Sequence, residues 1–263
     1  NYAAESHAEG VNTYLRWLNR IDNSDWIPVA ILFLSQFRHE PGYVLWFFGR
    51  LERLAAYMHV CARNINQRIE RYAVLLSALE RKHEPENPIH AVELTEQEKA
   101  AMRRALNGDI YELTARRRNY IILRLDSFLS DGAATYEPNV LTIEHVLPQT
   151  VVSGSPWLED WPQETQRRQW LHRLANLVPL NQRRNSQAQN YDFQRKKTAY
   201  FGGRRKVSSF VLTTQVLDTD AWTPEVVAER QERLLDVLAD HWELGEPVTE
   251  YRRDEDLLGS LAL

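Results

Sequence analysis

The feature that most constrains the fold is a short apolar stretch that runs into an acidic residue, a histidine and a proline. In the segment 143–149, Pro148 fixes φ and has no N–H to donate, so a strand entering this segment must end beside His145. The later segment 174–185 reads as a short apolar strand, then a polar stretch and a helix start. The two strands predict a small hairpin with Glu144 and His145 at its edge.

The residue types at that edge indicate hydrolytic chemistry on phosphate. A carboxylate such as Glu144 suits a hard cation, Mg²⁺ or Mn²⁺, and the adjacent imidazole of His145 can take a proton from water near neutral pH. Together they can drive in-line attack on a phosphodiester. An Asn side chain both donates and accepts, so we expect Asn176 to pin the loop after Pro148 and Asn185 to offer a neutral oxygen to the metal.

In order and type these residues resemble the HNH motif, also called the ββα-metal or His-Me finger motif. The resemblance implies that Glu144 and Asn185 bind the metal, that His145 is the general base, and that Asn176 orients the hairpin loop. Asn176 comes 31 residues after His145, a longer gap than in compact HNH motifs. We therefore expect an insertion between the strands, carrying Trp157, Trp161, Trp170 and His172. His172 is expected to be a packed or hydrogen-bonded neighbour of the site rather than a metal ligand.

A longer pattern covers much of the chain. It consists of E-H-V-L-P-Q at 144–149, H-x-L-x-N-L at 172–177, and N-x-x-F-x-x-K-x-x-x-Y at 190–200. This pattern resembles the C-terminal nuclease domain of GmrSD-type modification-dependent restriction enzymes, and SspE-like phage-defence effectors have a related architecture. The family usually has Gly in place of Ala175, where a positive φ would strain an alanine.

The family resemblance, rather than composition or spacing, implies the function and the partners. It implies a metal-dependent DNA endonuclease that nicks or cleaves phage or foreign DNA in a modification-linked restriction or antiviral system. In this family a ParB-like N-terminal domain with NTPase activity normally precedes the helical region. Because the chain opens at Asn1 without a Met, we expect it to be a C-terminal fragment.

Positive charge is concentrated around the candidate site. The window 161–206 holds 11 Lys or Arg against two acidic residues, while the whole chain has a net charge of −4. Such a surface suits DNA phosphates, whose contacts are salt-sensitive and largely independent of sequence; a solvated basic surface paired with the acidic C-terminal helix is the alternative. We expect Lys196 to position the phosphate, on one helix face with Asn185 if that helix is continuous. The expected DNA-binding residues are Arg183, Arg184, Arg195, Lys197, Arg204, Arg205 and Lys206.

The periodicity of apolar residues predicts a mainly α fold: a helical bundle region, a small ββα-metal nuclease module and a C-terminal helix. We expect a helical region at 1–132, the nuclease module at 133–213, and a C-terminal helix with an acidic tail at 214–263 that packs on the module. Thr95 with Glu98 forms a capping box, and Thr223 with Pro224 is an N-cap followed by a first-turn proline. The expected helices lie at 26–37, 43–60, 61–79, 99–106, 111–129 and 224–242.

Composition limits the class of protein. A hydrophobic content of 43% and eight Trp support a substantial core. The single cysteine, Cys61, excludes an internal disulfide, argues against a thiolate zinc site and fits a reducing cytoplasm. No apolar run approaches the length of a bilayer span, so no membrane partner is expected.

Two other interpretations remain open. The HNH scaffold could be a catalytically weak clamp that binds DNA without cutting it. The chain could instead be an interaction domain that regulates a neighbouring NTPase domain, with its basic strip docked on an acidic partner. The motif also leaves RNA open as a substrate, because both polymers share the phosphate.

Overall fold

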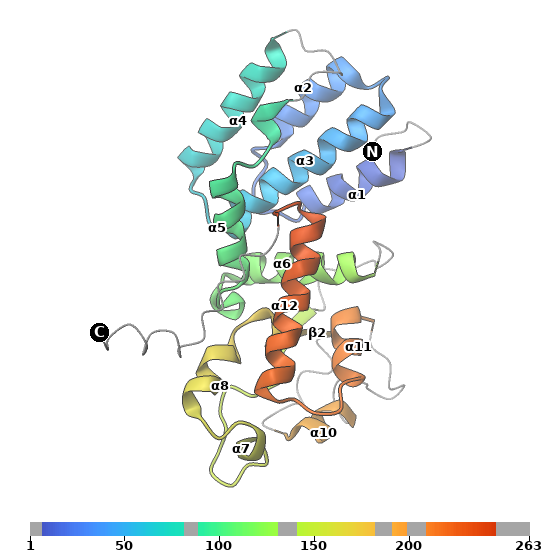
Figure 1. Ribbon diagram of the computed structural model, residues 1–263. Helices are drawn as coiled ribbons and strands as arrows, with labels where there is room; N and C mark the ends of the chain where they lie inside the picture. Colours follow the sequence, from blue (N-terminus) through green and yellow to red (C-terminus); the bar gives the residue numbers. More distant parts are fainter. Residues whose placement is uncertain (1–6, 82–88, 131–140, 182–190, 199–208, 246–263) are drawn as a thin grey trace, which may run out of the picture.

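The computed structural model describes residues 7–81, 89–130, 141–181, 191–198 and 209–245 (Figure 1). This part of the chain is mainly helical with a small two-stranded sheet, which confirms the predicted fold class. The elements before the sheet are α1 (Ala8–Leu18), α2 (Ile27–Phe37), α3 (Pro41–Val60), α4 (Ile65–Glu80), η1 (His90–Val92), α5 (Glu96–Leu106), η2 (Ile110–Glu112) and α6 (Ala115–Leu129). From the sheet onward they are β1 (Leu141–His145), α7 (Trp157–Asp160), α8 (Glu164–Leu171), η4 (Leu174–Asn176), β2 (Leu177–Asn181), α10 (Phe193–Lys196), α11 (Val211–Leu217) and α12 (Pro224–His241).

Helix starts in the N-terminal part follow local capping chemistry. The predicted capping box of α5 is confirmed, because the Thr95 side chain accepts from the Glu98 N–H and the Glu98 side chain accepts from the Thr95 N–H. The expectation of one helix over 61–79 is wrong at its beginning. Ala62 has a φ of +55°, which ends α3, and Asn64 then caps α4 with a box of its own.

Helix α6 begins later than predicted. Residues 110–112 form the 3₁₀ turn η2, and the α-helix starts at Ala115 rather than at Tyr111. The reason is a tertiary contact: the Tyr111 N–H donates to the His172 carbonyl at 3.0 Å, which fixes this residue against the segment between the strands. The turn η2 therefore belongs to the surroundings of the hairpin.

Strands β1 and β2 form the predicted hairpin and run antiparallel, with His145 opposite Leu177 at its closed end. The insertion between them carries α7, α8 and η4. Its three tryptophans, Trp157, Trp161 and Trp170, are buried in a core that also includes Val178 of β2. The insertion thus packs on the hairpin and shares a hydrophobic core with it.

Helix α12 extends from the region of the hairpin to the helices of the N-terminal part (Figure 1). Its predicted start is confirmed, because the Thr223 side chain accepts from the Val226 N–H and Pro224 occupies the first turn. Val227, early in the helix, is buried with the tryptophans of the insertion, whereas Leu238, near its end, is buried with the helices of the N-terminal part. One helix therefore contributes to both hydrophobic cores.

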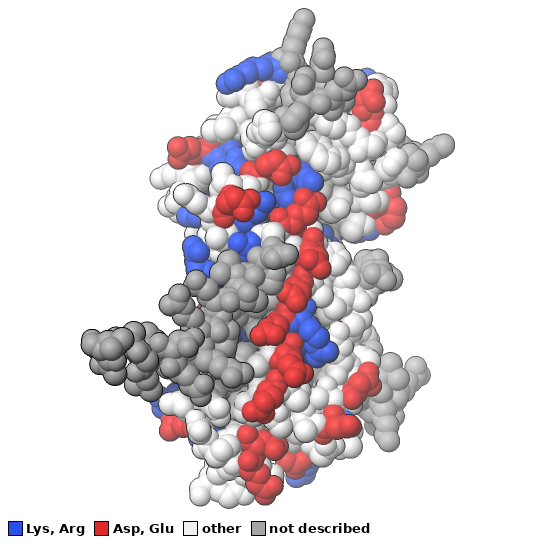
Figure 2. Space-filling model, in the orientation of Figure 1, with Lys and Arg blue, Asp and Glu red and all other residues white. Residues whose placement is uncertain are grey.

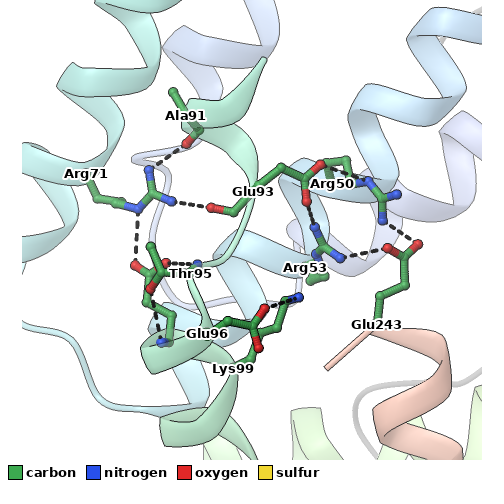
Figure 3. Close-up of polar contacts among 10 residues, drawn as sticks. Arg50, Arg53, Arg71, Ala91, Glu93, Thr95, Glu96, Lys99 and Glu243 are labelled. Atoms are coloured by element: carbon green, nitrogen blue, oxygen red, sulfur yellow. Dashed lines mark hydrogen bonds and ion pairs between the residues drawn. The ribbon is translucent and has the colours of Figure 1, made fainter. Parts of the chain in front are cut away.

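The residues after α12 join it to α3 (Figure 3). Glu243 pairs with both Arg50 and Arg53, and Glu93 pairs with the same two arginines from the other side. Arg53 is only 3% exposed, so these carboxylates compensate a buried positive charge. This network connects three segments that lie far apart in the sequence.

The condition under which Lys196 and Asn185 would share one helix face, a helix continuous through both residues, is not met. Helix α10 begins at Phe193, and the side chain of Asp192 caps it by accepting from the Arg195 N–H at 2.9 Å. Asn185 and the acidic tail from residue 246 lie outside the described residues. None of the helices in the described parts combines the length and the apolar character needed to cross a bilayer.

Candidate active site

His145 is the last residue of β1 and is buried, with only 5% of its surface exposed. Both ring nitrogens have neighbours from the chain. Nε2 lies 3.2 Å from Nδ1 of His172, and Nδ1 lies 3.2 Å from the side-chain nitrogen of Gln149. On its far side, His172 Nε2 lies 3.4 Å from a carboxylate oxygen of Glu112. A chain of polar contacts thus runs from Gln149 through both imidazoles to Glu112.

Tyr111 of η2 packs against both imidazoles. Its ring centroid lies 4.1 Å from that of His145 and 5.7 Å from that of His172, where the rings are stacked. The Arg118 guanidinium covers Tyr111 at 4.4 Å and donates to the Tyr111 carbonyl at 2.7 Å. Aromatic and cationic packing therefore restrict how the two histidines can turn.

The surroundings keep His145 neutral. Burial, then His172 and the positive charges of Lys196 and Arg118, lower the pKa of His145 to about 3. His145 is therefore uncharged near neutral pH, the form that can accept a proton, and its burial makes it a weaker base than a free imidazole. The same burial limits access of water, so a base at this position needs an opening on one side of its ring.

Asn176, at the end of η4, is fully buried, and its side chain makes four hydrogen bonds. Its Oδ1 accepts from the Leu147 N–H at 2.7 Å and from the Trp222 indole at 3.2 Å. Its Nδ2 donates to the carbonyls of Leu147 and Leu171, at 3.1 and 2.9 Å. The side chain therefore braces the backbone directly after His145 and next to Pro148.

Helix α12 holds η4 in place from the other side. The Ala175 N–H donates to the Gln231 side chain at 2.9 Å, and the Ala175 carbonyl accepts from Arg230 at 3.2 Å. Ala175 is not among the non-glycine residues with positive φ in the described segments, so it adopts a conformation open to alanine. The departure from the usual glycine is thus compatible with this backbone.

Lys196 lies under the end of β1. It is 2% exposed, and its ammonium donates to the carbonyls of His145 at 2.8 Å and Val146 at 2.9 Å. Burial lowers its pKa to about 8, against the opposing effect of the Glu144 carboxylate. The structure therefore brings Lys196 to the candidate base as a support for its backbone, and contact with a phosphate would require this buried ammonium to be uncovered.

Glu144 is half-buried and neighbours His145 in β1. Its negative charge acts on Lys196, whose pKa it raises against the effect of burial. A carboxylate there fits a hard cation, but no group of three His, Cys, Asp or Glu that could hold a metal is found in the described parts of the chain. The second expected ligand, Asn185, lies outside them, so the metal site stays a prediction.

Two of the expected DNA-binding residues fall within the described ranges. Arg195 is exposed and lies over the Tyr191 ring at 3.8 Å, whereas Lys197 donates to the Thr219 carbonyl at 2.6 Å. The other five, Arg183, Arg184, Arg204, Arg205 and Lys206, lie outside these ranges.

The face formed by α12 is acidic. Figure 2 shows a line of acidic side chains down this face, and the exposed acids of the helix are Glu225, Glu229, Glu232, Asp236 and Asp240. Within the described segments, no ion pair joins these acids to the basic window 161–206. A polyanion would be repelled from this face, so it would have to approach from another side.

Sequence reasoning missed three residues at the site: Tyr111, Glu112 and Gln149. Gln149 was part of the quoted motif without a role, and its place four residues after His145 was the available signal. Tyr111 and Glu112 were assigned to a helix, and nothing in their local pattern distinguishes them from helical residues. Only the contact of η2 with His172 reveals them.

The fold and the site together define a mainly helical domain built around a hairpin that presents a buried histidine. Residues 96–237 match the family of GmrSD restriction endonucleases, C-terminal domain. The chain belongs to this family, and with it to the nucleases of restriction defence. A comparison with curated proteins finds no match.

Proposed function

We propose that this chain is a metal-dependent DNA endonuclease domain in which His145 is the general base. The observation that carries the proposal is the end of the hairpin: the buried His145 ring closes β1, Lys196 bonds the carbonyls of His145 and Val146, and Asn176 bonds the backbone of Leu147. Family membership gives the reaction class, and the geometry supports the choice of the base.

In the proposed reaction His145 takes a proton from water while the water oxygen attacks the phosphorus. A bound Mg²⁺ or Mn²⁺ would supply stabilisation of the charge on the phosphate and the leaving oxygen, with Glu144 and Asn185 as its protein ligands. Asn176 and Lys196 keep the backbone of residues 145–147 in one position, so that the base does not drift from its target.

Of the two described candidates, Arg195 is the exposed one, and we assign it a phosphate contact. We assign the same role to Arg183, Arg184, Arg204, Arg205 and Lys206, and a salt-sensitive, sequence-independent affinity follows from such contacts. The proposal further assigns the domain to the cytoplasm, phage or foreign DNA as its target, and modification sensing to a ParB-like NTPase domain as its partner.

The test is a supercoiled-plasmid assay with the purified chain in Mg²⁺, in Mn²⁺ and in EDTA. We expect open-circular or linear DNA in either metal, intact plasmid in EDTA, and intact plasmid with His145→Ala. The matched control is His39→Ala, which removes an exposed histidine after α2 and should cleave like the wild type. Equal cleavage by His145→Ala would reject His145 as the base, and binding of DNA without cleavage in any metal would favour the clamp.

A further inference from the structure

The contacts around His145 and His172 limit where each proton can lie, because the role of each ring nitrogen depends on the tautomer. A carboxylate at Glu112 can only accept, so the His172 nitrogen that faces it, Nε2, carries a hydrogen. When His172 carries one ring proton, on Nε2, its Nδ1 has a lone pair that can accept from His145 Nε2 at 3.2 Å. In that arrangement the proton of His145 is on Nε2 and its lone pair is on Nδ1.

We propose that His172, held by Glu112, is a positioning residue that keeps the proton of His145 on Nε2 and so makes Nδ1 the atom that receives the proton from water. The inference rests on the proposed nuclease function and names the working atom of its base. Neither His172 nor Glu112 touches the substrate in this arrangement; both act through His145.

The turn η2 contacts the two histidines in three ways. It supplies the Glu112 carboxylate to one nitrogen of His172, and its Tyr111 N–H donates to the His172 backbone at 3.0 Å. The Tyr111 ring packs on both imidazoles, so a rotation of either ring would collide with it. Backbone, carboxylate and aromatic ring from one three-residue turn thus hold the same pair of histidines.

The other nitrogen of His145 faces the exposed end of the loop. Gln149 is exposed, and its side-chain amide lies 3.2 Å from Nδ1, where it can donate to the lone pair. Because a surface side chain can swing into solvent without disturbing the core, water can take its place. Nδ1 is therefore the nitrogen that water can reach by displacing Gln149, whereas Nε2 faces the His172 ring.

The proton balance of the step follows. An O–H bond of water breaks and its proton goes to Nδ1 of His145, while the oxygen forms a bond to phosphorus and the P–O bond to the leaving group breaks. The imidazolium so formed still donates from Nε2 to His172, and the nearby Glu112 carboxylate offsets part of the new charge.

The test combines ¹⁵N NMR of the histidine rings, in metal-free protein, with plasmid cleavage kinetics. His172→Phe keeps an aromatic ring beside Tyr111 but removes the acceptor, and His172→Asn restores an acceptor near the position of Nδ1. We expect the wild type to show His145 protonated on Nε2 alone. His172→Phe should show mixed tautomers and a kcat lower by about 10- to 100-fold with KM unchanged, and His172→Asn should recover part of both. Glu112→Gln removes the carboxylate beside His172 and should lower kcat. Its matched control is Glu159→Gln, which removes an exposed acid on α7 and should leave kcat unchanged.

Two readouts separate the possible failures. A wild-type His145 that carries its proton on Nδ1, or a His172→Phe protein with unchanged tautomer and kcat, overturns the positioning role while plasmid cleavage leaves the nuclease assignment standing. A tautomer change in His172→Phe without cleavage by any protein supports the contact between the histidines and overturns the proposed function.

Discussion

At the scale of single residues, Asn176 is the side chain on which the site geometry depends most directly. Its amide satisfies buried groups of Leu147 and Trp222 and the partly buried carbonyl of Leu171. Buried polar groups that lose their partners cost free energy, and this cost is larger than the net gain from making the bond. The sequence predicted a bracing asparagine here, and the structure shows which groups it braces.

Asn176→Ala should lower the free energy of unfolding by about 3 kcal/mol or more, because it leaves four buried groups without their partner. Urea unfolding followed by tryptophan fluorescence measures the change. Asn66→Ala, an exposed position on α4, is the matched control and should change the stability little. A loss below about 1 kcal/mol for Asn176→Ala would contradict the bracing role.

Gln149→Ala should leave kcat within about threefold of the wild type, because water can replace the amide at His145 Nδ1. The measurement is the plasmid cleavage rate at saturating DNA. A loss as large as that of His145→Ala would instead place Gln149 on the substrate.

At the scale of elements, local signals located the helix ends where capping decides them. Thr95 and Thr223 cap α5 and α12 as their sequence patterns predicted. The start of α6 was predicted four residues too early, because Tyr111 is held by His172, 61 residues further along the chain. A local sequence pattern contains no information about a contact with so distant a residue, so the sequence predicts α-helix where the structure has η2.

Gln231→Leu should loosen η4 against α12, since the Ala175 N–H would lose its acceptor. We expect faster hydrogen exchange of the Ala175 amide and a loss of about 2 kcal/mol in unfolding free energy. The control is Glu232→Leu, which changes the exposed neighbour of Gln231 on the same helix. Unchanged exchange at Ala175 in Gln231→Leu would show that η4 does not need this contact.

At the scale of the whole molecule, buried groups connect the helices of the N-terminal part to the rest. Glu52 accepts from Tyr120 of α6 and from the Trp242 indole after α12, so one carboxylate on α3 joins three segments. His59, near the end of the same helix, is 5% exposed and packs edge-on against Tyr120. Burial lowers the pKa of His59, and Asp22 opposes this only in part.

Acid should therefore destabilise the protein through His59. Its folded pKa lies below that of the unfolded chain, so the unfolded state binds more protons below about pH 6.5 and stability falls as the pH falls. Between pH 7 and pH 5 this contributes a loss of stability. His59→Phe should reduce the pH dependence of the unfolding free energy in this range, and His39→Phe, at an exposed histidine, should not. Parallel pH profiles for the wild type and His59→Phe would contradict the assignment.

The sequence by itself determined the helical class, the hairpin that ends at His145 and the family, because capping, proline geometry and motif order are encoded over a few residues. Only the tertiary structure decided what surrounds the base. His172 and Gln149 contact the His145 ring, Glu112 reaches it only through His172, and Lys196 is buried beneath it. Side-chain partners of this kind depend on how elements far apart in the chain pack together, and no local pattern carries that information.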